Sequence, residues 1–377
     1  MTVIAGYARS PFTPARKGAL ARTRPDDIAA TVVDGLIEKL GLDPALVEDI
    51  IVGTAFPEGE QGFNLARMLT FLTDLPESVP GVTINRFCGS SMQAIHDAAG
   101  RIAMDAGEAF IAGGIESMTR IPMTGFNPMP NPRMSDVAPD ALTSMGITAE
   151  NLAVKYGIDR VTQEAFAVAS HARASGAREA GNFAEEIVGI ETEAGLVSED
   201  GCIRPGTDAA TLAGLKPAFD ASGSVTAGTS SPLTDGAAFV LVCTEEFAQA
   251  NGLKPLARIL STAVSGCAPE LMGIGPVEAS NKALERAGLT LDDIDIVELN
   301  EAFAAQSLAV IEELGLDPLK VNIDGGAISL GHPLGASGAR ITGKAASLLQ
   351  RNGAKRALAT MCVGGGQGIA TVLEKYE

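Results

Sequence analysis

The sequence predicts an α/β protein made of two repeated halves with a further segment inserted between them. The stretch GLIEKLGLDPALVEDIIVG at 35–53 resembles NKALERAGLTLDDIDIVEL at 281–299, and in each an amphipathic helix, a glycine stop and an acidic turn precede a β-branched strand. Gly41 of the first copy matches Gly288 of the second, an offset of 247 residues. Helix-then-strand units of this kind predict helices layered on sheets.

The same offset nearly relates two further junctions of the chain. The expected strand VTIN at 82–85 leads to Cys88 and a helix rich in small residues, and the expected strand KVNI at 320–323 leads to His332 and a similar helix. If the two copies pack face to face about a pseudo-twofold axis, the N-termini of these two helices meet at the centre. We therefore expect the cysteine and the histidine to occupy nearly equivalent places.

The region between the copies follows another pattern. It begins with MTRIPMTGFNPMPNPRM, which has no periodicity, continues with helical patterns at 150–157 and 162–181, and closes with SGSVTAGTSSPLTDGAA. Long structured insertions often cover functional sites. We therefore divide the chain into an N-terminal half at 1–117, an inserted loop domain at 118–248 and a C-terminal half at 249–377.

Composition excludes several classes of protein. Of the 377 residues, 46% are apolar and 20% charged, which is a globular composition, and the net charge of −18 argues against a nucleic-acid or anionic-membrane binder. The five cysteines are widely spaced and lack a C-x-x-C pair, so neither a disulfide framework nor a structural zinc site is expected. The sequence shows no signal-peptide pattern and no stretch suited to a membrane span, and we expect a cytoplasmic location.

Two residues at strand-to-helix junctions are candidates for catalysis. Cys88 lies in NRFCGSSMQA, where the free N–H groups and positive end of a helix favour a thiolate, lower the thiol pKa and can bind an oxyanion; the alternative is a buried apolar cysteine. His332 lies in GGAISLGHPLGASGAR, a glycine-rich loop suited to close backbone approach. The other histidines, His96 and His171, are expected to be ordinary helix residues.

Two further segments end strands. Cys362, in ATMCVGGGQGIA, precedes a glycine run that either turns backbone N–H groups toward a ligand or forms a tight hairpin. Asn300 and Glu301, in VELNEAFAAQ, fit a helix N-cap and first turn on pattern alone. The stretch GARITGKA at 338–345 lacks the Ser or Thr that a P-loop places after its lysine and is expected inside a helix, so a nucleotide-binding module has little support.

Taken together, the motifs resemble the thiolase family. NRFCGSSMQA, NEAF, GGAISLGHPLGASGAR and CVGGGQG occur in this order and at the family's intervals, and AGGIESMTRIPM, SMGITAENLA, LKPAFD, TAGTSSPLTDGAA and MGIGPV extend the match over essentially the whole chain. The resemblance implies a thiolase-like α/β fold, in which two repeated halves form a five-layer α-β-α-β-α core with an inserted loop domain. It also implies an enzyme that acts on acyl-coenzyme A thioesters.

The resemblance assigns roles to five residues. Cys88 would be the nucleophile that forms an acyl-enzyme, His332 would take its proton, and Cys362 would protonate the carbanion of the departing acetyl-CoA. One oxyanion hole would use His332 and a water held by Asn300, and the other the backbone N–H groups of Cys88 and Gly364. Coenzyme A enters as a substrate, and neither a metal nor a permanently bound cofactor is required.

Further residues are carried over for coenzyme A binding, with Arg204 as the partner of a phosphate or the adenine. The remaining contacts implied by the resemblance are Phe219, Ala227 and Ser231, with Met145 and Phe303 near the pantetheine and acyl end. The resemblance also implies a homodimer or homotetramer that binds acyl-CoA and coenzyme A. Degradative bacterial relatives sometimes pair with a hydratase/dehydrogenase subunit, whereas no nucleic-acid partner and no membrane span are expected.

Three departures from the biosynthetic pattern indicate the branch. Biosynthetic acetoacetyl-CoA thiolases tend to show CGSG, a His before the Met of MGITAE, and NASG, whereas this chain has CGSS, Ser144 before Met145, and TSSP. We therefore predict reversible thiolytic cleavage of 3-ketoacyl-CoA, as in fatty-acid β-oxidation. The alternatives are a biosynthetic acetyl-CoA acetyltransferase that makes acetoacetyl-CoA and a non-catalytic acyl-CoA-binding relative.

Overall fold

The two halves each build a sheet with the same strand order. The computed structural model describes all 377 residues. In the N-terminal sheet the order is β1-β8-β5-β3-β4, with β2 beside β8, and in the C-terminal sheet it is β9-β12-β11-β10; a short β1–β9 pairing joins the two. The strands are β1 (Thr2–Arg9), β2 (Thr13–Pro14), β3 (Asp49–Gly53), β4 (Gly81–Ile84), β5 (Ala109–Ser117), β8 (Thr234–Thr244), β9 (Ala257–Gly266), β10 (Ile296–Leu299), β11 (Arg356–Val363) and β12 (Gln367–Lys375).

The pairing pattern confirms the internal repeat. In each half a parallel pair, β3–β5 or β10–β11, continues into an antiparallel pair, β5–β8 or β11–β12. The predicted glycine stops are also confirmed, because Gly41 and Gly288 end helices α1 (Pro25–Leu40) and α9 (Gly275–Ala287) with φ angles of 60° and 66°.

One expected strand is not formed. Residues 320–323 make only an isolated parallel bridge to β10, between Val321 and Val297. Asn322 has a φ of 49°, and its side chain hydrogen-bonds the backbone N–H and C=O of Leu299 at 2.9 and 2.8 Å. Backbone bonds to β10 are made only at Val297, and at Leu299 the side chain of Asn322 takes the place of the bonds that a further strand residue would make.

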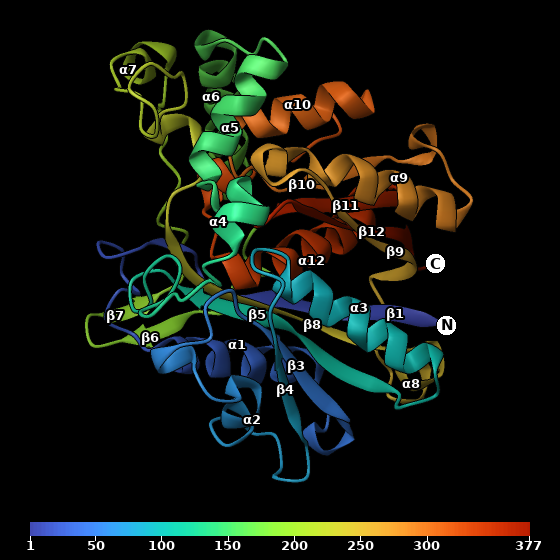
Figure 1. Ribbon diagram of the computed structural model, residues 1–377. Coiled ribbons are helices and arrows are strands. Elements are labelled where there is room, and N and C mark those ends of the chain that lie inside the picture. Colours follow the sequence, from blue (N-terminus) through green and yellow to red (C-terminus); the bar gives the residue numbers. More distant parts are fainter.

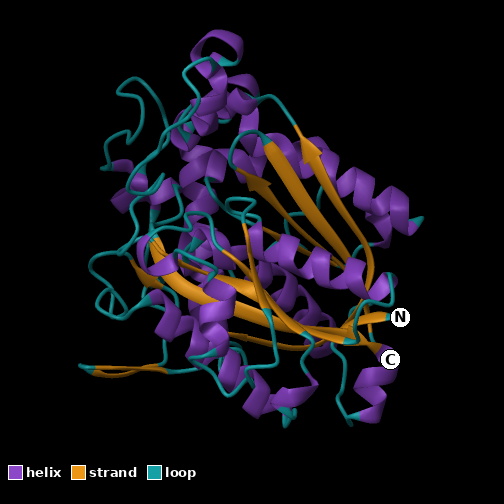
Figure 2. Ribbon diagram, turned by 60° about the horizontal axis from the view of Figure 1, so that its bottom comes forward, coloured by secondary structure: helices purple, strands orange, loops and turns teal.

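The helices and sheets form the five layers that the sequence resemblance implied (Figures 1 and 2). Helix α1 covers the outer face of the N-terminal sheet, with α2 beside β4, and α9 and α10 lie on the outer side of the C-terminal sheet. Helices α3 and α12 lie between the two sheets. The bounds not yet given are α2 (Leu65–Thr70), α3 (Ser90–Ala103), α10 (Ala304–Leu314) and α12 (Leu334–Asn352).

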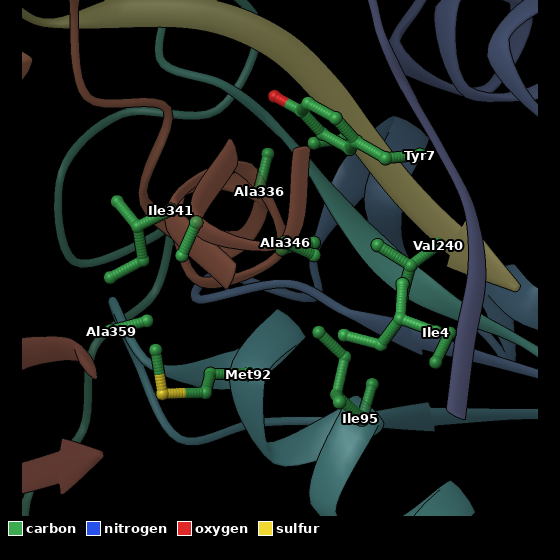
Figure 3. Close-up of a cluster of buried hydrophobic side chains, with 14 of the residues drawn as sticks. Ile4, Tyr7, Met92, Ile95, Val240, Ala336, Ile341, Ala346 and Ala359 are labelled. Carbon is green, nitrogen blue, oxygen red and sulfur yellow. The ribbon is translucent and has the colours of Figure 1, made fainter. Parts of the chain in front are cut away.

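Small residues let the two central helices touch. In Figure 3, Ala336, Ile341 and Ala346 of α12 lie in one apolar cluster with Met92 and Ile95 of α3. The backbone N–H of Ala339 donates to Ser91 Oγ at 2.8 Å. The contact places the N-terminal turns of α3 and α12 side by side at the centre of the molecule, as the repeat predicted.

A glycine at this contact gives a stability prediction. A Cβ added to Gly338 of α12 would stand 2.4 Å from the backbone N of Met92, whereas a Cβ on Gly100 of α3 meets nothing within 4 Å. We expect Gly338→Ala to lower the free energy of unfolding by about 1–3 kcal/mol. Gly100→Ala should raise it by up to about 1 kcal/mol, because alanine is the better helix former. Urea unfolding of both variants checks this, and equal midpoints would contradict the packing described.

The segment between the halves contains helices that lie next to α10 (Figure 1). The helical patterns at 150–157 and 162–181 correspond to α5 and α6. Because β8 lies between β1 and β5, residues 234–244 belong to the N-terminal sheet; the division at 117 and 248 stays a prediction. The elements here are α4 (Met134–Val137), α5 (Met145–Lys155), α6 (Arg160–Glu179), β6 (Ile190–Thr192), β7 (Gly195–Val197) and α7 (Ala209–Ala213), and α8 (Glu245–Ala250) follows β8.

The sequence predicts neither a membrane-spanning segment nor a phosphate-binding loop at 338–345. None of the helices combines the length and the apolar character needed to traverse a bilayer. The stretch at 338–345 lies inside α12, where Lys344 forms ion pairs with Glu186 and Asp324, and it therefore offers no phosphate-binding loop.

Candidate active site

A cavity of about 370 Å³ opens beside the N-terminal turns of the two central helices, and three sequence-predicted residues line it: Cys88, His332 and Cys362. Four of the six residues carried over for coenzyme A line it as well. The structure thus brings together residues from both halves and from the segment between them. The other lining residues are Met123, Ser144, Met145, Gly146, Phe219, Ser230, Ser231, Pro232, Leu233, Met272, Ala302, Phe303 and Leu334.

A tight turn between β4 and α3 positions Cys88. Phe87, just before it, has a φ of 44°, and its N–H donates to Asn85 Oδ1 at 2.7 Å. The hydroxyl of Ser90 donates to Phe87 O at 2.6 Å. This bonded turn leaves Cys88 only 4% exposed at the cavity.

The protonation state of Cys88 differs from the sequence prediction. Burial raises its pKa to about 11, and the charge of Glu116 adds to this, while hydrogen bonds from the N–H groups of Gly364 and of Cys88 itself lower it. The prediction of a lowered pKa is therefore wrong, because desolvation outweighs the helix end. At neutral pH the residue is therefore a thiol that needs a base before it can attack.

Ser337 and Asn300 determine the tautomer of His332. The Ser337 hydroxyl donates its one hydrogen to Pro333 O (3.0 Å), and its oxygen lies 2.5 Å from His332 Nδ1. Asn300 Nδ2, which can only donate, lies 3.3 Å from His332 Nε2, so Nε2 accepts and Nδ1 carries the hydrogen that the Ser337 oxygen accepts. Burial, with a contribution from Arg340, lowers the pKa of His332 to about 3, so the ring is neutral and Nε2 is a base.

Asn300 is not an N-cap, so the interpretation favoured by pattern alone is wrong. Helix α10 begins at Ala304 with Phe303 at the N-cap position. The Asn300 side chain turns to His332 instead, and its Oδ1 is buried without a hydrogen-bond partner. The neighbouring Glu301 carboxylate accepts from Ser170 Oγ (2.6 Å) and Asn322 Nδ2 (2.8 Å), which holds this loop in place.

Cys362 lies at the start of a tight hairpin, which confirms one of the two alternatives raised by its glycine-rich sequence; that backbone N–H groups there face a ligand stays a prediction. It is the penultimate residue of β11, and the antiparallel hairpin to β12 turns through Gly365 and Gly366, whose φ angles are 77° and 78°. It also lines the cavity, 1% exposed. Burial, with Cys88 nearby, raises the pKa of the Cys362 thiol far above its usual range. The cavity thus holds a second thiol that keeps its proton at neutral pH.

The loop at 230–233 forms another wall of the cavity. Ser231 N donates to Ala302 O at 3.0 Å, and Leu233 bridges to His332. The rings of Phe219 and Phe303 meet edge to face, with centroids 5.7 Å apart. Arg204 and Ala227 are exposed and do not line the cavity.

Sequence reasoning missed several residues of the site. Ser337 contacts His332 directly, and Met123, Met272 and Leu334 line the cavity. Leu334 and Met272 lie inside quoted motifs, but an apolar side chain carries no chemical signal of its own. Ser337 was detectable only as a hydroxyl one helical turn from the histidine. The structure contains no group of three or more His, Cys, Asp or Glu residues able to hold a metal ion.

Comparison with known proteins identifies the family of the chain. The model of the N-terminal thiolase domain matches residues 2–246, and that of the C-terminal thiolase domain matches residues 253–375. The chain is 47% identical to a 3-ketoacyl-CoA thiolase of Bacillus subtilis, covering 99% of this chain and 98% of the relative. It is 48% identical to a 3-ketoacyl-CoA thiolase of Pseudoalteromonas translucida, covering 100% of this chain and 99% of the relative.

Solved structures agree over the full length. A Bacillus anthracis acetyl-CoA acetyltransferase superposes with a TM-score of 0.91 at 39% identity, covering 100% of this chain and 98% of the other. Human mitochondrial 3-ketoacyl-CoA thiolase gives a TM-score of 0.91 at 37% identity, covering 100% and 99%. From its matched domains, its fold and its full-length relatives, the chain belongs to the thiolase family.

Proposed function

We propose that the protein is a thiolase acyltransferase that cleaves 3-ketoacyl-CoA with coenzyme A, giving acetyl-CoA and an acyl-CoA two carbons shorter. One observation carries this proposal: a neutral thiol with a neutral imidazole and a second protonated thiol line one mostly apolar cavity. Full-length relatives at 47% and 48% identity bear the name 3-ketoacyl-CoA thiolase. The reaction breaks the bond between carbons 2 and 3 and converts one thioester and one thiol into two thioesters, and its reverse is a Claisen condensation.

In the proposed first step, Cys88 attacks carbon 3 of the substrate. His332 Nε2 takes the thiol proton as the sulfur–carbon bond forms, since both groups start uncharged. Negative charge develops on the carbonyl oxygen, and the N–H groups of Cys88 and Gly364, which also act to lower the pKa of the Cys88 thiol, would supply its oxyanion hole.

In the proposed second step, the bond between carbons 2 and 3 breaks. The electron pair passes to carbon 2 as the enolate of acetyl-CoA, whose oxygen is met by His332 Nε2–H and by the side chain of Asn300 or a water that it holds. Cys362 gives its proton to carbon 2 and regains one from the incoming coenzyme A thiol. That thiol, now a thiolate, attacks acyl-Cys88 and releases the shortened acyl-CoA, and the departing Cys88 thiolate takes back the proton that His332 holds. No redox change occurs, and coenzyme A is a substrate rather than a resident cofactor.

The proposed path of coenzyme A follows the wall at 230–233. Phe219, Ser231, Met145 and Phe303 would contact the pantetheine and acyl end, in keeping with their place at the cavity. Arg204 and Ala227 would meet the nucleotide end. Exposed side chains at these two positions suit contacts outside the cavity, where the phosphates remain close to water.

The degradative branch is favoured by the apolar walls. Met123, Met145, Met272 and Leu334 offer adaptable apolar surface to an acyl chain longer than acetyl. A coupled assay with 3-ketoacyl-CoA substrates from four to sixteen carbons tests this. Thiolysis at six carbons and beyond supports the proposal, whereas activity confined to four carbons would assign the biosynthetic acetyl-CoA acetyltransferase reaction. Folded protein inert at every length would indicate a non-catalytic acyl-CoA-binding relative.

Replacing Ser337 with alanine should weaken catalysis through His332. The change leaves Nδ1–H buried without its acceptor, at a cost of about 1–3 kcal/mol, and frees the ring to turn. We expect kcat for thiolysis to fall by about 10- to 100-fold with a small change in KM. Ser280→Ala is the control, because Ser280 is equally buried and donates to Thr360 Oγ1 at 3.1 Å outside the cavity. Equal kcat values for the two variants would contradict this role.

We further propose a homodimer formed through the free edge of the N-terminal sheet. Strand β4 ends that sheet with an unpaired edge, and the nearby Phe63 is 96% exposed, with Phe71 and Phe87 also exposed. An open edge beside apolar rings is costly in water and suits pairing. Light scattering should give the mass of two chains, or four if dimers pair, and Phe63→Glu should lower it; a wild-type monomer would contradict the proposal. A hydratase/dehydrogenase partner and a cytoplasmic location stay predictions.

A further inference from the structure

Glu116, at the end of β5, is a fully buried carboxylate that contacts no cation. Both of its oxygens act only as acceptors, which fits the ionised form. These bonds offset part of the cost of burial, which still raises the pKa of the Glu116 carboxyl above its ordinary value. The donors are Thr54 Oγ1 (3.2 Å), Ala55 N (2.7 Å), Phe56 N (3.4 Å), Gln61 Nε2 (2.6 Å) and Gly335 N (2.9 Å).

Two glycines bring helix α12 onto this carboxylate. A Cβ on Gly114 would stand 2.2 Å from Gly335 O, and a Cβ on Gly335 would stand 2.7 Å from Ile115 O. Only residues without side chains allow this approach. The N–H of Gly335 is one of the donors in the first turn of α12 that have no partner within the helix. Glu116 of the N-terminal half accepts from this N–H, and its negative charge faces the positive end of a helix of the C-terminal half.

Hydrogen bonds lead from the same carboxylate oxygen to Cys88. Glu116 Oε2 accepts from Ala55 N, and Ala55 O accepts from Asn85 Nδ2 at 2.9 Å. Asn85 Oδ1 in turn accepts from the N–H of Phe87, the residue immediately before Cys88. Three consecutive bonds therefore connect Oε2 to the turn that presents the nucleophile.

The other branch leads to the base. Oε2 also accepts from Gly335 N, and Ser337, two residues further along the same helical turn, accepts from His332 Nδ1. We propose that Glu116 is a positioning residue that holds Cys88 and His332 in register across the junction of the two halves. The inference rests on the roles proposed above for Cys88 and His332.

Two variants distinguish the effect of the charge of Glu116 from the effect of its side-chain length. Glu116→Gln removes the charge and turns an NH₂ group against N–H donors, so kcat should fall by about 10- to 100-fold, because small misplacements of reacting groups are costly. KM for coenzyme A should change little. Alkylation of Cys88 by iodoacetamide should have its pH midpoint at lower pH, since the carboxylate no longer opposes the thiolate. Glu116→Asp keeps the charge but is one methylene shorter, so kcat should fall while the midpoint stays.

His332 and Cys362 are the other titratable groups that line the cavity with Cys88, and both are unchanged in the two variants. Glu186→Gln is the control. Glu186 is a buried carboxylate that ties Arg9 of β1 to Lys344 of α12, at 2.9 and 3.0 Å, and it does not line the cavity. Glu186→Gln should lower the free energy of unfolding. It should leave kcat per folded molecule and the pH midpoint of Cys88 alkylation unchanged.

A kcat for Glu116→Gln that matches Glu186→Gln, or an unmoved alkylation midpoint, would overturn the proposal. If Glu116→Gln does not fold, Glu116→Asp and Gln61→Met, which removes one donor to Oε1, take its place, and wild-type kcat in both would overturn it equally. Alkylation needs no substrate. A protein inert toward every 3-ketoacyl-CoA whose alkylation still responds to Glu116 would refute the proposed function and not the positioning role.

Discussion

Replacing Cys88 with alanine is expected to lower the rate of 3-ketoacyl-CoA thiolysis by more than about 10⁴-fold. The variant loses the thiol proposed to form the acyl-enzyme, while His332, Cys362 and the apolar walls remain to bind substrate. The alanine fills the same buried position, and folding should be little changed. Steady-state thiolysis together with the affinity for acetyl-CoA, measured by calorimetry, separates lost chemistry from lost binding.

Cys243→Ala is the matched control for this change. Cys243 is also fully buried, but it lies on β8 within the apolar core and does not line the cavity. Its replacement should leave kcat near the wild-type value. Thiolysis within tenfold of wild type by Cys88→Ala would show that the nucleophile lies elsewhere.

Replacing Cys362 with alanine should slow carbon–carbon cleavage while acetyl exchange with coenzyme A continues. Thiolysis requires a proton at carbon 2 of the departing acetyl-CoA, so the rate of carbon–carbon cleavage should fall by about 10²- to 10⁴-fold. Transfer of an acetyl group between acetyl-CoA and labelled coenzyme A forms no carbanion, so Cys362 never gives up its proton and does not need one from the incoming thiol. His332 alone then moves the proton between Cys88 and coenzyme A, and the exchange should stay within about tenfold of the wild-type rate.

Measuring both rates on one preparation makes the comparison internal. The raised pKa of Cys362 gives the physical reason, because a thiol that keeps its proton can serve as the acid. Parallel loss of exchange and cleavage would mean that Cys362 supports Cys88 or the fold rather than the carbanion. Undiminished cleavage would assign the proton to another group.

The repeated architecture could be predicted because the same local helix-turn-strand pattern occurs in both halves of the sequence. Gly41 and Gly288 end equivalent helices at the same point of a helix-turn-strand unit, and the structure places both in the left-handed region. Residues 320–323 show the limit of that reasoning. Their β-branched pattern matched β4, yet the side chain of Asn322 bonds the backbone of Leu299 in β10. That contact depends on a neighbour that local sequence does not identify.

The site was predictable in its chemistry and not in its electrostatics. Cys88, His332 and Cys362 could be singled out because thiols and imidazoles beside glycine-rich turns are rare in this chain. The pKa of Cys88 was predicted in the wrong direction, because the helix end is visible in sequence and the depth of burial is not. Glu116 and Ser337 act through contacts between segments more than 200 residues apart or through a shared helical turn, and only the folded chain reveals them.

The most direct test is to mix the enzyme with a six-carbon 3-ketoacyl-CoA in the absence of free coenzyme A and to record the intact mass of the chain. With no thiol to accept the acyl group, one equivalent of acetyl-CoA should be released and the chain should gain the mass of one four-carbon acyl group. Proteolysis should place that group on the peptide that carries Cys88, and neutral hydroxylamine should remove it. An unmodified chain that nevertheless releases acetyl-CoA, or an acyl group on another residue, would contradict catalysis through acyl-Cys88.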